Sequence, residues 1–187
     1  VHLKTSLKII LCAGILSAVE SSHAATTWKN VVVPAGGYVS GVAYSPVSHG
    51  LMYARTDMGG AYRWDAASSQ WIPITDWIAD WNLYGIESIA PDPVDANKVY
   101  MAIGQTYNGT DGYILVSSDQ GSTGVTYSIG TMIGANNDDR NAGERLAVDP
   151  NLPSKLYFGS RYEGLWVSTN SAATWSQVTA FPTTGAS

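Results

Sequence analysis

The chain has 187 residues, enough for one domain with a sizeable core, and it is rich in Gly, Trp and Tyr but poor in Phe and in charged side chains. This composition is typical of an all-β fold with many turns. The 10 Lys and Arg against 15 Asp and Glu give a net charge of −5 without a basic cluster, which argues against a nucleic-acid partner.

The first 24 residues have the features of an export signal. Two lysines precede the apolar stretch Ile9–Val19, and residues 22–24 fit a small-x-small cleavage site. A membrane anchor is the competing interpretation, but the apolar stretch is short for a span. We therefore expect a signal peptide at 1–24 and a secreted mature chain, extracellular or periplasmic, with no membrane partner after cleavage.

Removal of this signal would leave little metal-binding or nucleophilic chemistry. Cys12, the only cysteine, lies inside it, and His49 would be the only remaining histidine. One histidine without a thiol builds neither a His-based metal site nor a Ser-His-Asp triad. We expect no metal site.

The stretch from Leu51 to Asp65 predicts a hairpin. Strands are expected over Leu51–Arg55 and Ala61–Trp64, because both runs are rich in β-branched and aromatic residues. The turn between them carries Asp57 and the Gly59–Gly60 pair.

The frame of this hairpin recurs in the chain. The segments Gly41–Ala54, Ser88–Ala102 and Arg145–Gly159 align, and in each a proline precedes a tyrosine by seven residues. The copies are spaced by 47 and then 57 residues. An apolar run, a proline turn and a second apolar run predict two antiparallel strands per copy.

Each copy continues with two more expected strands, which gives four strands at a period near 50 residues. The third strands are Ala61–Trp64, Tyr113–Ser117 and Gly164–Ser168, and the fourth are Trp71–Ile74, Tyr127–Ile129 and Trp175–Val178. This period is that of β-propeller blades, and a β-sandwich of unrelated hairpins is the alternative. Closed propellers have four to eight blades, so we expect 25–187 to be the N-terminal part of an incomplete propeller domain.

The turn before two of these last strands carries a propeller-associated pattern. Residues 117–123 match the Asp-box S-x-D-x-G-x-T, with Gly124 where the pattern has Trp, and residues 168–175 are a diverged copy with Asn170 in place of Asp. An Asp or Asn in such a turn accepts backbone N–H bonds. We expect Asp119 to be structural.

Comparison of the repeats singles out Asp57. It lies four residues after Tyr53, and the equivalent positions after Tyr100 and Tyr157 carry Gly104 and Arg161. The scaffold therefore does not require an acid there. Asp57 is either a functional carboxylate or a turn residue that forms a salt bridge with Arg55.

Two loops are further candidates for binding. Trp77, Trp81 and Tyr84 lie in an aromatic loop between the first two copies. Such side chains stack on the apolar faces of sugar rings, or else pack between blades. The polar loop Asn136–Arg140 could bind calcium, donate hydrogen bonds to a polar ligand, or be solvated, and it lacks the spacing of a calcium loop.

The sequence resembles the N-terminal part of glycoside hydrolase family 74, the xyloglucan-cleaving enzymes. The resemblance rests on GGYVSGVAYSP, LMYARTDMGGAYRWD, QWIPITDW, DWNLYGIES and GERLAVDP, and it covers residues 27–180. It implies a secreted enzyme of two seven-bladed propellers facing each other across a cleft, of which this chain would contain about three four-stranded blades. Members cut the β-1,4-glucan backbone of xyloglucan with inversion, using one aspartate from each propeller.

On this resemblance, Asp57 takes the place of the general base, and the general acid would lie in the second propeller, outside this chain. Arg55, Trp77, Trp81 and Tyr84 are the candidates for substrate binding. No metal or organic cofactor is implied, and the partners are xyloglucan or a related β-glucan and the second propeller. The alternatives are a non-catalytic carbohydrate-binding or Asp-box propeller, similar to sialidase repeats, and a scaffold propeller that binds proteins.

Overall fold

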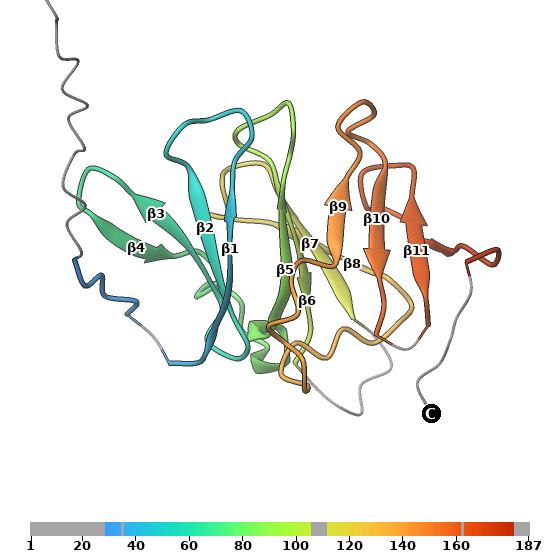
Figure 1. Cartoon of the computed structure of the whole chain (residues 1–187), viewed down its shortest axis with the longest axis horizontal. Helices are drawn as coiled ribbons and strands as arrows, with labels where there is room; N and C mark the ends of the chain where they lie inside the picture. The colour runs from blue at the N-terminus through green and yellow to red at the C-terminus, as the bar shows by residue number, and fades with distance from the viewer. Residues whose placement is uncertain (1–28, 35, 106–111, 162, 182–187) are drawn as a thin grey trace, which may run out of the picture. The chain divides into compact units, whose positions relative to one another are not determined.

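The computed structural model describes residues 29–34, 36–105, 112–161 and 163–181 (Figure 1). The expected signal peptide at 1–24 lies outside them. All strands belong to the compact unit that begins at Val31. The described residues include one short 3-10 helix, η1 (Trp81–Tyr84), and no helix among them is long and apolar enough to cross a membrane.

The described residues of this unit form three antiparallel sheets of four strands each, and within each sheet the strands follow one another in chain order. The first sheet comprises β1 (Val39–Tyr44), β2 (Met52–Thr56), β3 (Ala61–Asp65) and β4 (Gln70–Pro73). The second comprises β5 (Ile86–Pro91), β6 (Val99–Ile103), β7 (Tyr113–Ser117) and β8 (Val125–Ser128). The third comprises β9 (Leu146–Val148), β10 (Leu156–Gly159), β11 (Leu165–Ser168) and β12 (Ser176–Gln177).

The strand register confirms the internal repeat. Tyr53, Tyr100 and Tyr157, the repeated tyrosines, pair with Ala43, Ala90 and Ala147 of the first strands. The first two sheets also share a register shift at the same place, between Val39 and Gly41 and between Ile86 and Ser88. The all-β prediction and the grouping into four-stranded units are therefore correct, and the described sheets do not close into a ring.

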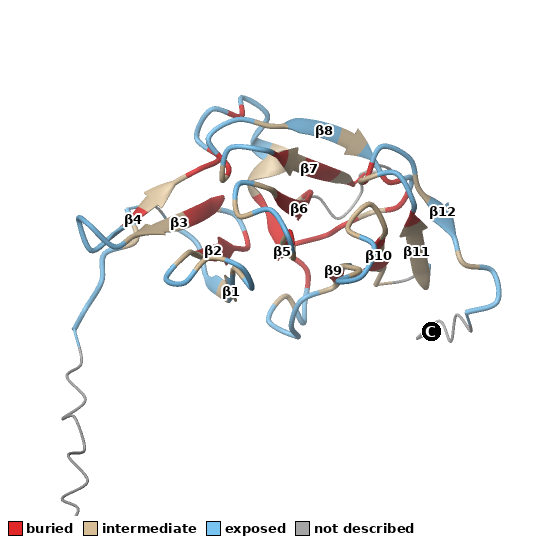
Figure 2. Cartoon of the chain, turned by 90° about the horizontal axis from the view of Figure 1, so that it is seen from above, coloured by how far each residue is buried: buried red, intermediate tan, exposed pale blue. Residues whose placement is uncertain are grey.

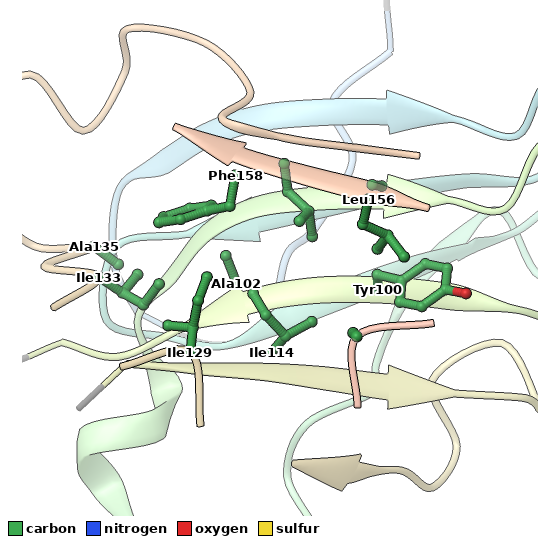
Figure 3. Close-up of a cluster of buried hydrophobic side chains, with 11 residues drawn as sticks. Tyr100, Ala102, Ile114, Ile129, Ile133, Ala135, Leu156 and Phe158 are labelled. Carbon is green, nitrogen blue, oxygen red and sulfur yellow. The ribbon is translucent and has the colours of Figure 1, made fainter. Parts of the chain in front are cut away.

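In the second sheet, β5, β6 and β7 are buried because they pack between the other two sheets, whereas β8 is largely exposed (Figure 2). Successive side chains of a strand point to opposite faces, and β6 follows this rule. Val99, Met101 and Ile103 pack in the cluster shared with the first sheet, whereas Tyr100 and Ala102 pack with the third. Figure 3 shows the cluster between the second and third sheets, in which Phe158 and Leu156 of β10 lie above Ile114 and Ala102.

The turns before β8 and β12 are closed by the hydrogen bonds expected for Asp119 and Asn170. Asp119 Oδ1 accepts the Thr123 N–H (2.9 Å) and the Ser117 hydroxyl (2.7 Å). Asn170 Oδ1 accepts the Thr174 N–H (2.9 Å) in the same way. Hydrogen bonds from Thr123 lower the pKa of Asp119, because they stabilise its charged form. Asp119 therefore fixes a turn.

The loops that concern function lie at one end of the three sheets, the end at which η1 lies in Figure 1. They are the turn between β2 and β3, the segment 74–85 that enters β5, and the segment 129–145 that enters β9. The first strands lie close together, since β5 contacts β1 and β9. This arrangement brings loops from all three sheets to one region.

Candidate active site

Asp57 lies directly after the last residue of β2 and is 4% exposed. Its Oδ1 accepts the backbone N–H of Tyr38 at 2.8 Å, and its Oδ2 lies 2.9 Å from Nε of Arg140. The Asp57 N–H donates in turn to the Tyr38 carbonyl (3.2 Å). The carboxylate is thus held between the segment that precedes β1 and the loop that precedes β9.

The turn that carries Asp57 depends on the absence of a side chain at Gly59. A Cβ there would lie 1.7 Å from the carbonyl oxygen of Gly36, so the two backbones are in direct contact. Thr56 closes the turn, because its hydroxyl accepts the Gly59 N–H and donates to the Gly60 carbonyl, both at 2.8 Å. Close backbone approach therefore requires glycine at position 59, and the positive φ of Gly60 (83°) favours glycine at the next position.

A pocket of about 420 Å³ lies beside this turn. It is lined by Gly36, Gly37, Met58, Gly59, Asp76 and Tyr84. The predicted binding residue Tyr84 is therefore part of the pocket wall, and its hydroxyl donates to the Ile78 carbonyl (2.7 Å). Met58 and Gly59 directly follow Asp57, so the pocket and the carboxylate share one turn.

Trp77 and Trp81, the two other aromatic candidates, are exposed and do not line this pocket. The indole N–H of Trp77 is shared between the carbonyls of Ile74 (2.9 Å) and Gly121 (3.3 Å), which ties its loop to the β7–β8 turn. Trp81 begins η1, which Asp80 caps by accepting the Asn82 N–H (3.0 Å). Trp81 is 63% exposed, so its ring is available to a ligand.

Arg55 lies beneath the site and is 1% exposed. Its Nε pairs with Glu144 (2.6 Å), one terminal nitrogen donates to the Ser40 hydroxyl (2.8 Å), and the other donates to the Gly143 carbonyl (3.2 Å). The salt bridge that the sequence suggested between Arg55 and Asp57 is therefore replaced by two different pairs, Arg55 with Glu144 and Asp57 with Arg140. All three guanidinium nitrogens of Arg55 therefore donate to protein groups.

Glu144 connects the three sheets in this region. Besides Arg55 of the first sheet, it binds the Ser88 hydroxyl (2.6 Å) and the Ile89 N–H (2.7 Å) of the second. Glu87 forms a second such connection, since it pairs with Arg145 (2.6 Å) and Arg161 (2.9 Å). Burial raises the pKa of Glu87, against the opposing effect of the two arginines.

The sequence identified the polar loop that contains Arg140 without assigning its contacts. Arg140 and Tyr38, the two partners of Asp57, lie 83 and 19 residues from it in the chain, and no spacing rule connects them. Gly36 and Gly37, which line the pocket, entered the sequence analysis only as the first residues of the stretch GGYVSGVAYSP. Among the described residues, no three His, Cys, Asp or Glu side chains are grouped so that they could hold a metal ion.

No protein-family model matches the chain, whereas individual proteins do. It is 46% identical over 192 residues to a xyloglucanase of a Paenibacillus species, which covers 96% of this chain and 19% of that protein. A xyloglucanase of Hypocrea jecorina is 45% identical over 92% of this chain and 22% of its own length.

Solved structures agree with these sequence matches. The crystal structure of a family 74 xyloglucanase from Xanthomonas campestris superimposes with a TM-score of 0.75 and 44% identity, covering 83% of this chain and 23% of that one. The chain spans about a fifth of the length of the relatives that it matches. Sequence and fold together therefore place the chain in glycoside hydrolase family 74, as a segment that corresponds to about a fifth of such a protein.

Proposed function

We propose that this chain forms part of a secreted, inverting xyloglucan hydrolase and supplies its general base, Asp57. The observation that carries the proposal is the identity of 46% and 45%, over 96% and 92% of the chain, to proteins named xyloglucanases. Because the chain spans about a fifth of those proteins, the rest of the enzyme, including its general acid, comes from outside these residues. Residues 1–24 have the composition of an export signal. Secretion suits an enzyme whose substrate is a polysaccharide outside the cell.

In the proposed reaction, Asp57 takes a proton from a water molecule. The water oxygen bonds to the anomeric carbon of a backbone glucose while the bond to the glycosidic oxygen breaks. An acid from the second propeller donates a proton to that departing oxygen, so that water is consumed and two chain ends are released. The two carboxyl groups would be roughly 6.5–9.5 Å apart, which leaves room for the water.

Three features of the chain support Asp57 in this role. Its position carries no acid in the other two repeats, so the fold does not need one. Its carboxylate has defined partners on both oxygens, which fixes its orientation. The turn that it occupies also forms part of the wall of a mainly apolar pocket, to which Asp76 adds a carboxylate and Tyr84 an aromatic ring.

The proposal is tested in a chimera in which this chain replaces the matching fifth of the Paenibacillus xyloglucanase. We expect the chimera to hydrolyse xyloglucan and to release the α-anomer first, as seen by proton NMR. Asp57→Asn should lower kcat by roughly 10²–10⁴-fold while xyloglucan binding is retained. Asp65→Asn, in a turn at the far end of β3, is the matched control and should leave kcat unchanged.

Each alternative predicts a different result. A folded chimera that binds xyloglucan without hydrolysing it would favour the non-catalytic carbohydrate-binding propeller. Full activity of the Asp57→Asn variant would remove Asp57 as the base, and initial release of the β-anomer would overturn the inverting mechanism. The isolated chain, which lacks the second carboxylate, should show no hydrolysis.

A further inference from the structure

Arg140 contacts the proposed base Asp57, but the reaction proposed above gives Arg140 no role. Its Nε lies 2.9 Å from Asp57 Oδ2, although the N–H is not aligned for a hydrogen bond, so the contact is an ion pair. The other oxygen of Asp57 accepts the Tyr38 N–H. With one partner on each oxygen, the plane of the carboxylate is fixed by Tyr38 and Arg140 together.

The side chain of Arg140 is itself held in place. Its guanidinium lies over the ring of Tyr38, 5.7 Å from the ring centroid, in a cation–π contact. One terminal nitrogen donates to the Asn137 carbonyl (3.4 Å) within the same loop. Because Tyr38 also binds Asp57 through its backbone, the same residue positions the carboxylate and its cation.

The backbone of Arg140 is anchored by the buried Arg55. A terminal nitrogen of Arg55 donates to the Arg140 carbonyl at 3.2 Å, and Arg55 also binds Gly143 and Glu144 further along that loop. A Cβ at Gly41 would lie 2.7 Å from Arg55 Nε, so glycine at this position leaves room for the guanidinium.

The repeats show that this anchor is specific to the first sheet. Arg55 lies two residues after the repeated Tyr53, and the equivalent positions carry Ala102 and Gly159. The arginine therefore occurs in the one copy that also carries Asp57. An arginine that the other two copies lack, close to an acid that they also lack, points to a common purpose.

We propose that Arg140 is a positioning residue for the general base: it holds the Asp57 carboxylate in the orientation that accepts a proton from water, and Arg55 holds the loop from which it acts. This inference rests on the proposed function of Asp57. Arg140 is 35% exposed, so its own contribution to folding is small compared with that of a fully buried ion pair.

The test compares kinetics of Arg140 variants in the chimera. Arg140→Ala should lower kcat by about 10²-fold with KM unchanged, because a misdirected base slows the chemical step without weakening substrate binding. Arg140→Lys, which keeps the charge but not the planar fork, should retain more activity than Arg140→Ala. Arg63→Ala is the control, since Arg63 lies on the same sheet and binds Gln120 (3.0 Å).

A double-mutant cycle separates positioning from a structural role. If Arg140 acts through Asp57, Arg140→Ala should cause no further loss of kcat in the Asp57→Asn background, whereas a structural defect would lower both backgrounds equally. Equal losses, unchanged kcat in Arg140→Ala, or an effect on KM alone would overturn the inference. Full activity of Asp57→Asn alone would instead overturn the assignment of the base.

Discussion

Arg55 and Glu144 lie 89 residues apart in the chain, and their side chains meet at 2.6 Å beneath the candidate site. Their exposure differs, since the Arg55 side chain is 1% and the Glu144 side chain 32% exposed. The pair joins the end of β2 to the loop that precedes β9. It therefore couples the first and third sheets at the point where Asp57 is held.

Replacement of Glu144 should destabilise the fold more than replacement of most other side chains that are equally exposed. Glu144→Leu leaves the Arg55 cation buried without a counter-charge, which typically costs roughly 3–5 kcal/mol, at the low end here because water reaches Glu144. Chemical denaturation of the chain measures the change. The double variant Arg55→Met, Glu144→Leu should recover part of the loss, and a double variant less stable than Glu144→Leu would contradict the argument.

Gly59→Ala should destabilise the turn that carries Asp57. The added carbon would lie 1.7 Å from the Gly36 carbonyl, so one of two backbones must move, and overpacking of this kind costs about 1–3 kcal/mol. Gly36→Ala is the matched control, because a Cβ at Gly36 would meet nothing within 4 Å. The midpoint of thermal unfolding compares the two, and equal midpoints would mean that the contact is not tight in solution.

Asp119 should make the stability of the chain depend on acid pH. Hydrogen bonds from Thr123 and Ser117 lower the pKa of Asp119 below its unfolded value, so its contribution is present above about pH 4 and is lost as pH falls through the lower folded value. Asp119→Asn should reduce this dependence, because the equivalent Asn170 makes the same turn without a charge. Acid unfolding curves of both forms test this, and parallel curves below pH 4 would contradict it.

Most of the fold was predictable from the sequence, because it follows from local rules. Apolar runs separated by turn residues and the repeated proline–tyrosine offset predicted every sheet, and the pairing of Tyr53, Tyr100 and Tyr157 confirmed their equivalence. The errors were in strand ends: β12 is two residues long where four were expected.

The contacts of the site were less predictable, because they connect segments far apart in sequence. Arg55 and Asp57 are two residues apart, so a salt bridge between them was a reasonable expectation. In the structure both side chains meet the loop before β9, and this loop supplies Glu144 to one and Arg140 to the other. Charge alone could not choose among the arginines of the chain, since the choice depends on how the third sheet packs.

Trp81 is the exposed aromatic residue best placed to report on sugar binding near the site. It is 63% exposed and begins η1, and Tyr84 at the other end of η1 lines the pocket. Pairs of aromatic rings contribute about 0.5–1.5 kcal/mol, and we expect a similar contribution from a ring on the apolar face of a sugar, so Trp81→Ala in the chimera should weaken binding of xyloglucan oligosaccharides by roughly two- to tenfold. Calorimetric titration measures this affinity. Tyr44→Ala is the control, because Tyr44 is equally open to solvent but ends β1, at the other end of the sheets. Equal affinities of the Trp81 and Tyr44 variants would remove Trp81 from the binding surface and leave the pocket beside Asp57 as the place to look for sugar contacts.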